Sequence, residues 1–146
     1  MKIFIDSANL NDIEEALKRG FPRGITTNPS ILAKEPKIDF KLHIEKIIGL
    51  LVKYKYEIPL SVEVFTNDPE EMVKQGEDFI KSFDYPYVNV KIPIGWGGLQ
   101  AIYELRKRDI KVNCTCCMSY NQAVMAALAG ANFVSLFYGR IRDMGH

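Results

Sequence analysis

The feature that most constrains the fold is a repeated alternation of short apolar segments with amphipathic helical segments. Residues 2–6 have the pattern of a buried strand, and the following stretch places Leu10, Ile13 and Leu17 on one helical face before Gly20. The same order recurs along the chain and predicts parallel strands joined by right-handed helical crossovers. The predicted strands are residues 2–6, 24–28, 59–65, 87–94, 110–116 and 132–137.

Two of the predicted helices carry clear start signals. Asp68 is suited to cap the helix that Pro69 begins, and Glu71 completes a capping box with it. Ser119 is placed in the same way ahead of Gln122, and Gly130 ends that helix. The predicted helices are residues 9–20, 39–54, 67–83, 97–108 and 119–130.

Two architectures fit this alternation, an open doubly wound sheet and a closed (β/α)₈ barrel. The first strand-to-helix turn, DSANLND, has no G-x-G-x-x-G motif, so the dinucleotide-binding fingerprint of many open sheets is absent. Successive side chains of a strand point to opposite faces of the sheet. In each predicted strand one face is apolar and the other becomes polar at the carboxyl end, where barrel enzymes carry their active sites. We therefore predict an α/β fold of the (β/α)₈ TIM-barrel type, with about six βα units. The second face is formed by Phe4, Asp6, Thr26, Asn28, Ser61, Glu63, Asn89, Lys91, Asn113, Thr115, Ser135 and Phe137.

Length and charge indicate the number of domains and limit the kinds of partner that the chain can bind. The chain has 146 residues, 47% of them hydrophobic, which suffices for one core, so we predict a single domain over residues 1–146. The 19 basic and 18 acidic residues give a net charge of +1, which argues against nucleic-acid and membrane partners. The first residues contain no apolar run of signal length, and no segment approaches the roughly 20 apolar residues of a membrane span. These features predict a cytoplasmic protein.

The three cysteines lie close together, as Cys114, Cys116 and Cys117. A zinc site would need further ligands, and the only histidines are His43 and His146. We predict no metal site and reduced thiols that belong to the core.

Lys91 is unusual because lysine is depleted in strands. It lies between Val90 and Ile92, and if both faces of the strand are covered, its ammonium loses hydration at a cost. Structural roles, such as a pair between Glu63 and Lys91 or a turn capped by Asp6, explain each polar residue taken singly. Six strands that all end in polar groups are better explained by a cavity that holds water and a polar ligand.

Four segments resemble the transaldolase family: IFIDSAN at residues 3–9, TTNPSIL at 26–32, VNVKIP at 88–93 and SLFYGRI at 135–141. Together they span nearly the whole chain in order. The resemblance implies a class I aldolase-type barrel in which a lysine forms a Schiff base with a ketose. It also implies that neither a metal nor another cofactor is needed.

The resemblance carries specific roles onto residues of this chain. Lys91 is implied to form the Schiff base, and Asp6 to remove the proton from the C4 hydroxyl of the substrate. Glu63 is implied to move protons through a water molecule that Thr115 holds. The implied substrate-binding residues are Asn28, Asn113, Ser135, Phe137 and Arg140, of which Arg140 binds phosphate.

Two related reactions remain as alternatives. Glu63, Asn113, Ser135 and Phe137 resemble the transaldolase set, which implies transfer of dihydroxyacetone between sugar phosphates in the pentose phosphate pathway. The donor would be fructose 6-phosphate or sedoheptulose 7-phosphate. The relative fructose-6-phosphate aldolase, which releases free dihydroxyacetone, typically has glutamine at the first of these positions and tyrosine at the last.

A third alternative concerns the number of strands. A closed barrel needs eight strands, and the resemblance implies two further βα units beyond the six found here, so that the domain is C-terminally incomplete. An incomplete barrel without activity is therefore an alternative to an enzyme. Exposed sheet edges also predict a homo-oligomer.

Overall fold

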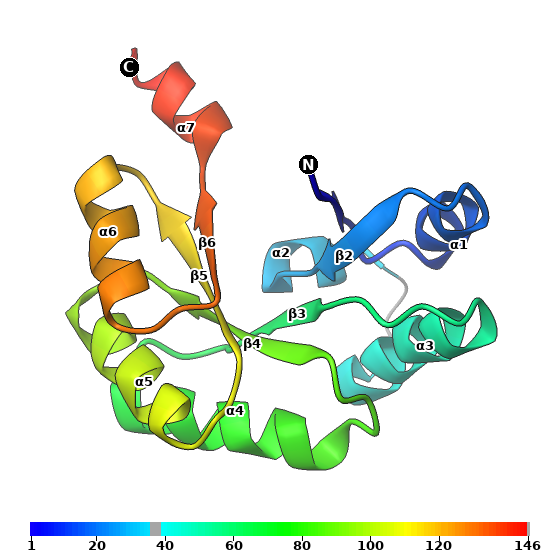
Figure 1. Cartoon of the computed structure of the whole chain (residues 1–146), viewed down its shortest axis with the longest axis horizontal. Coiled ribbons are helices and arrows are strands. Elements are labelled where there is room, and N and C mark those ends of the chain that lie inside the picture. The colour runs from blue at the N-terminus through cyan, green and yellow to red at the C-terminus, as the bar shows by residue number, and fades with distance from the viewer. Residues whose placement is uncertain (36–38, 146) are drawn as a thin grey trace. The chain divides into compact units, whose positions relative to one another are not determined.

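The computed structural model describes residues 1–35 and 39–145, and within them it confirms the alternation of strands and helices (Figure 1). The predicted position of each strand agrees with the structure to within a few residues. The strands are β1 (Ile3–Asp6), β2 (Pro22–Thr26), β3 (Leu60–Glu63), β4 (Val88–Pro93), β5 (Val112–Cys117) and β6 (Phe133–Leu136). The helices are α1 (Leu10–Lys18), α2 (Pro29–Leu32), α3 (Phe40–Lys53), α4 (Pro69–Ser82), α5 (Trp96–Lys107), α6 (Tyr120–Leu128) and α7 (Tyr138–Asp143).

The strands follow one another in the sheet in chain order, from β1 to β6. The chain divides into two compact units, the first comprising residues 1–63 and 83–88 and the second residues 64–82 and 89–146. The prediction of one domain over residues 1–146 stays a prediction. In the part of the chain that the structure describes, no helix has the length and apolarity needed to cross a membrane.

The first unit contains the parallel strands β1, β2 and β3. Asp6 at the end of β1 lies in register with Thr26 of β2, and Thr26 lies in register with Ser61 of β3. A close contact links β1 to β2, because a Cβ added to Gly24 would collide with the ring of Phe4. Glycine at this position therefore gives the Phe4 ring its space.

Helices α1 and α3 of this unit are joined by hydrogen bonds at the end of α3. The carboxylate of Glu14 accepts hydrogen bonds from Lys53 Nζ and Tyr54 Oη, both at 2.7 Å. The hydroxyl of Tyr56 donates to the carbonyl of Leu17 at 2.8 Å. Below these polar contacts the α1–α3 layer is apolar, with fully buried Ile13, Ile44, Ile47 and Leu51.

The second unit contains β4, β5 and β6, again parallel, with α4, α5 and α6 beside them (Figure 1). Helix α4 approaches closely at Gly76, where an added Cβ would lie 3.0 Å from Leu105 and 3.2 Å from Val90. The small residue lets α4 pack directly on strand β4 and helix α5. The fully buried core of this unit includes Val90, Ile92, Ala101, Ile102, Leu105 and Val112.

Two short helices were not predicted from the sequence. Strand β2 ends at Thr26, before the predicted end at residue 28, because Asn28 caps α2 and Pro29 begins it. Residues 138–143 form α7, so that Arg140 lies in a helical turn. Both segments are too short to show a clear apolar period, which is why alternation alone does not reveal them.

Two local details also differ from the sequence prediction. The Glu71 amide donates to Asp68 Oδ1 at 2.9 Å, which confirms the cap, but the Asp68 amide donates to the Thr66 hydroxyl at 3.1 Å in place of a return bond from Glu71. Ile3, expected on a covered apolar face, is 45% exposed.

Candidate functional site

The best-buried polar residues of the second unit lie on β4 and β5. Lys91 is 4% exposed, and its register partner on β5 is Asn113, which is 1% exposed. Thr115 follows two residues later on β5, in register with Pro93. Because residues two apart on a strand share a face, Asn113 and Thr115 lie on the same side of the sheet.

Thr115 is fully buried, and its hydroxyl oxygen has no hydrogen-bond partner among the described residues. A buried hydroxyl without a partner costs free energy, so such groups usually bond to ordered water or to a ligand. The position of this hydroxyl beside the end of β4 makes it suited to hold a water molecule there.

Strand β6 adds Ser135 to this group. The Ser135 hydroxyl donates to Asn113 Oδ1 at 2.9 Å, across the β5–β6 pair. The bond fixes the orientation of the Asn113 amide, because its oxygen is the atom that accepts. Strands β4, β5 and β6 thus bring Lys91, Asn113, Thr115 and Ser135 to one part of the second unit.

Phe137 and Arg140 occupy a more open place at the start of α7. Phe137 is 38% exposed, and Arg140 is also exposed. Residues 136–140, together with Asp143, line a depression of about 450 Å³. A guanidinium beside an open depression is well suited to bind an anion such as a phosphate group.

Three predicted site residues lie in the first unit, each at the carboxyl end of a strand or just beyond it. Asp6 ends β1, and its Oδ1 accepts a hydrogen bond from the Thr26 hydroxyl at 2.8 Å. Glu63 ends β3 and is partly exposed. Asn28 caps α2, since its Oδ1 accepts from the Ile31 amide at 2.9 Å.

Thr26 contacts this group, although no role was predicted for it from the sequence. It was placed on the polar face, but its bond to Asp6 depends on the register between β1 and β2. The signal that points to it is a threonine at the end of one strand and an aspartate at the end of its neighbour. Such a pair across two strands orients the carboxylate.

Cys114 and Cys117 of β5 belong to the core, as predicted, and both are fully buried and unbridged, whereas Cys116, predicted to belong to the core as well, is only partly buried. Their sulfur atoms lie 3.9 Å apart, because Cys116 between them has a φ of 64° and the strand register shifts there. Burial, and next the neighbouring Cys117, raise the pKa of the Cys114 thiol. Among the described residues, no group of three or more His, Cys, Asp or Glu side chains is arranged to hold a metal ion.

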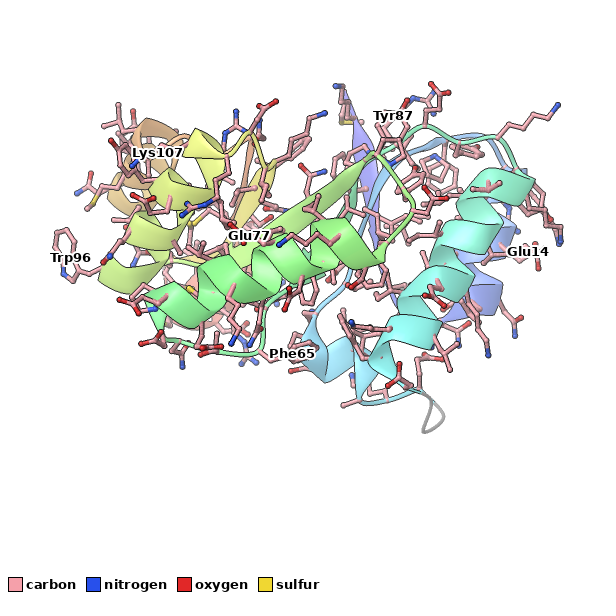
Figure 2. The ribbon with its side chains drawn as sticks, turned by 90° about the horizontal axis from the view of Figure 1, so that it is seen from below. Glu14, Phe65, Glu77, Tyr87, Trp96 and Lys107 are labelled. Carbon is pink, nitrogen blue, oxygen red and sulfur yellow. The ribbon has the colours of Figure 1, made fainter. Side chains whose placement is uncertain are left out.

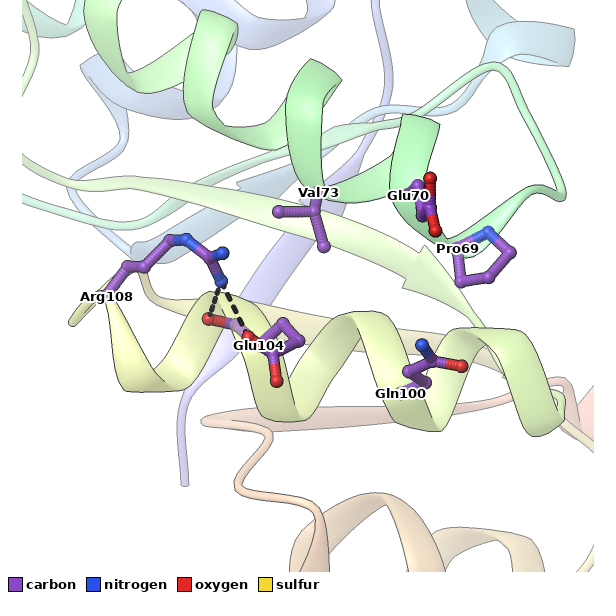
Figure 3. Close-up of a pocket in the computed structure, with 6 residues that line it drawn as sticks. All are labelled: Pro69, Glu70, Val73, Gln100, Glu104 and Arg108. Atoms are coloured by element: carbon purple, nitrogen blue, oxygen red, sulfur yellow. Dashed lines mark hydrogen bonds and ion pairs between the residues drawn. The ribbon is translucent and has the colours of Figure 1, made fainter.

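Two further cavities lie beside helices α4, α5 and α6. One of about 260 Å³ lies between α4 and α5 and is lined by residues such as Val73 and Arg108, with Arg108 bonded to Glu104 (Figure 3). A second, of about 230 Å³, is lined in part by Trp96, whose ring points away from the start of α5 and is 83% exposed (Figure 2). Neither lining includes a residue of the predicted site.

Comparison with known proteins gives a consistent family. The sequence model of the family described as Transaldolase/Fructose-6-phosphate aldolase matches residues 3–146. A "Probable transaldolase" of Dehalococcoides mccartyi is 44% identical over all 146 residues, and one of Carboxydothermus hydrogenoformans is 42% identical. The chain spans 65% and 64% of the length of these two relatives.

Solved structures of other enzymes share the fold. A 2,3-dimethylmalate lyase matches 99% of the chain with a TM-score of 0.61 at 15% identity, and the chain covers 62% of it. The phosphoribosyl anthranilate isomerase of Thermococcus kodakaraensis matches 93% of the chain with a TM-score of 0.58 at 13% identity, and 64% of it is covered. At such low identity the likeness concerns the fold alone, and it confirms the predicted α/β fold of the TIM-barrel type.

Proposed function

The chain belongs to the transaldolase/fructose-6-phosphate aldolase family, and we propose that its reaction is the transfer of dihydroxyacetone from a ketose phosphate to an aldose phosphate. The observation that carries the proposal is Lys91, a lysine buried within strand β4 with Asn113 beside it in register. A lysine amine held in a covered site is suited to attack a carbonyl.

In the proposed first step, the Lys91 amine attacks C2 of the ketose, and loss of water gives an iminium. The electron-withdrawing iminium then allows the bond between C3 and C4 to break, so that its electrons form an enamine on the protein. Asp6 takes the proton of the C4 hydroxyl, and the aldose leaves. The enamine attacks the aldehyde of the acceptor, and water finally releases the new ketose.

The other residues support these steps. Thr115 holds a water molecule through which Glu63 moves protons during formation and breakdown of the iminium. This role is supported by the Thr115 hydroxyl, which finds no hydrogen-bond partner in the described part of the chain. Asn28, Asn113 and Ser135 bind the dihydroxyacetone unit, and Arg140 binds the phosphate group. The bond from Ser135 to Asn113 supports a shared role for these two residues.

Reductive trapping tests the proposal directly. Borohydride added with fructose 6-phosphate reduces an iminium to a stable amine, and peptide mass spectrometry should find a three-carbon or six-carbon adduct on Lys91. Lys91→Met should abolish the adduct. Lys111→Ala, which removes an exposed lysine directly before β5, should leave it unchanged. An adduct on another lysine, or one that persists in Lys91→Met, contradicts the assignment.

Release of free dihydroxyacetone is the second candidate reaction, because the family description includes the aldolase. Incubation with fructose 6-phosphate alone separates the two: sustained release of dihydroxyacetone supports the aldolase, and turnover only with erythrose 4-phosphate supports transfer. Phe137 lies at the edge of the depression beside α7, and we expect Phe137→Tyr to increase release relative to transfer. An unchanged ratio contradicts a role for this ring in the balance.

We also propose that the chain self-associates. The support is a set of exposed large apolar side chains in the second unit, including Leu128 at 82%, Tyr138 at 73% and Leu136 at 53% exposure. Exposed apolar groups of this size favour association in water. Sedimentation velocity across a range of concentrations should show species larger than a monomer, and a single monomeric species throughout contradicts the proposal.

A further inference from the structure

His43 is a buried histidine to which the proposed reaction gives no role. It lies on α3 and is 3% exposed, and its Nε2 is 2.7 Å from the carbonyl oxygen of Ala8. Ala8 is itself fully buried. A carbonyl oxygen only accepts hydrogen bonds, so Nε2 carries the hydrogen and donates it. The bond satisfies a backbone acceptor that burial removes from water.

Ala8 belongs to the short loop that connects β1 to α1, and this loop begins directly after Asp6. On its other side, Asn9 caps α1 by accepting from the amides of Asn11 and Asp12 at 3.0 and 3.1 Å. The loop is therefore fixed at its end by the cap and in its middle by His43. The carboxylate of Asp6 is fixed separately by Thr26, at 2.8 Å.

Hydrogen bonds that join α1 to the end of α3 and the residues after it act farther from Asp6. Glu14 bonds to Lys53 and Tyr54, and Leu17 bonds to Tyr56, in the second half of α1 or at its end. The bond from His43 is made two residues after Asp6. Its loss therefore changes the backbone next to the carboxylate, whereas loss of the bond from Tyr56 changes the distant end of the helix.

We propose that His43 is a positioning residue for Asp6, and that it holds the loop after β1 so that the carboxylate meets the C4 hydroxyl of the substrate. The inference rests on the proposed function, because it gives His43 a role in the step that Asp6 performs. It predicts a specific kinetic pattern. Formation of the iminium at Lys91 does not need Asp6, whereas cleavage of the C3–C4 bond does.

The test compares His43→Leu, which removes the donor, with His43→Gln, whose amide nitrogen lies near the position of Nε2. In His43→Leu, the yield of the borohydride-trapped adduct on Lys91 and the KM should stay near those of the unmutated chain. The kcat for cleavage should fall about 100-fold, as expected when a reacting group is displaced by about 1 Å. His43→Gln should recover most of that loss.

Tyr56→Phe is the matched control, because it also removes one side-chain bond to a backbone carbonyl in the first unit, here between the segment after α3 and Leu17 of α1. It should lower stability but not kcat. Equal losses of adduct and cleavage in His43→Leu, the same kinetic loss in Tyr56→Phe, or no recovery in His43→Gln would overturn the inference.

Amide hydrogen exchange of residues 7–9 gives a readout that does not require turnover. Exchange should be faster in His43→Leu and near normal in His43→Gln and Tyr56→Phe. Failure of the unmutated chain to form any adduct would refute the proposed function and, with it, the catalytic purpose of this contact. Unchanged exchange in His43→Leu overturns the inference whether or not the chain forms the adduct.

Discussion

Strands β4 and β5 bury their polar residues, whereas Ser135 of β6 is half-buried and the segment from Phe137 into α7 is largely exposed. Lys91, Asn113 and Thr115 are each at most 4% exposed, while Phe137 is 38% exposed and Arg140 is exposed as well. Strands β4, β5 and β6 have the same alternation of apolar and polar residues in the sequence. They differ in pairing, since β5 has a neighbour on each side and β6 pairs with β5 alone among the described strands.

The comparison teaches that alternation predicts the face on which a side chain lies, but not its contact with water. Burial follows from what covers each face, and β4 is covered where Gly76 lets α4 approach Val90. Polar groups in the covered region must bond to one another, to water or to a ligand. Those at the start of α7 remain hydrated, which suits them to capture a charged ligand.

The largest difference between the two regions is expected for truncation of apolar side chains. Ile92→Ala in β4 removes a fully buried side chain and should lower the free energy of unfolding by about 2–5 kcal/mol. Leu136→Ala in β6 removes a side chain that is 53% exposed and should change it by less than about 1 kcal/mol. Urea unfolding followed by circular dichroism measures both, and equal losses would contradict the comparison.

Replacement of glycine by alanine should change the free energy of unfolding in opposite directions beside β4 and in α7. A Cβ at Gly98 in α5 would overlap the carbonyl oxygen of Pro93, so Gly98→Ala should destabilise the chain by about 1–3 kcal/mol. A Cβ at Gly139 in α7 would meet no atom within 4 Å, and Gly139→Ala should stabilise the helix by up to about 1 kcal/mol. The same unfolding measurement applies. Stabilisation by Gly98→Ala would show that the turn after β4 is loosely packed.

Alkaline pH should reveal the buried thiol of β5. The pKa of Cys114 is raised above its ordinary value of 9.0 by burial, so above pH 9 the unfolded chain loses this proton before the folded chain does. The contribution of this thiol to the free energy of unfolding is therefore fully present below pH 9. It falls as pH rises further, by up to about 1.4 kcal/mol per pH unit.

Replacement of the thiol tests this linkage. Cys114→Val removes the ionisable group, and the decline in unfolding free energy between pH 9 and 10.5 should become shallower than in the unmutated chain. Both proteins are measured in the same buffers with a reducing agent present. An identical decline in the two proteins would show that the Cys114 thiol contributes nothing to it.

The smallest expected difference concerns single polar contacts. Ser135→Ala removes the bond to Asn113 Oδ1 and should cost about 1 kcal/mol, because the acceptor belongs to a residue that is 1% exposed. Arg142→Ala in α7 removes a 3.3 Å pair with Asp143 in which both side chains are largely exposed, and should have no measurable effect. A cost for Arg142→Ala as large as that for Ser135→Ala would contradict the hydrated character of α7.

Much of the fold was predictable because the apolar residues of each strand and of each long helix recur with the spacing typical of that element. The caps at Asp68 and Ser119 were also local signals, and both are made, with bonds to Glu71 at 2.9 Å and to Gln122 at 3.3 Å. Helices α2 and α7 were missed because four and six residues are too few to show a helical period. In α2 the sequence Asn28–Pro29 was the available signal, since it places a cap before a proline.

The candidate site was predictable where it follows from alternation, as for Lys91, Asn113 and Thr115. It was not predictable where it depends on register between strands, as in the bond from Thr26 to Asp6. Counting by twos also fails after Cys114, because the positive φ of Cys116 shifts the pairing of β5 with β6. These contacts depend on the three-dimensional arrangement of segments that lie far apart in the sequence, or on a local bulge.

The contact between Phe4 and Gly24 couples two positions that are 20 residues apart in the chain. A side chain at position 24 collides with the aromatic ring, so it becomes acceptable only when position 4 carries a small residue. Substitutions at positions 4 and 24 are therefore coupled. A small residue must replace Phe4 before a larger residue can replace Gly24. Among diverged descendants of this sequence, aromatic residues at position 4 should accompany glycine at position 24, and larger residues at position 24 should accompany alanine or glycine at position 4.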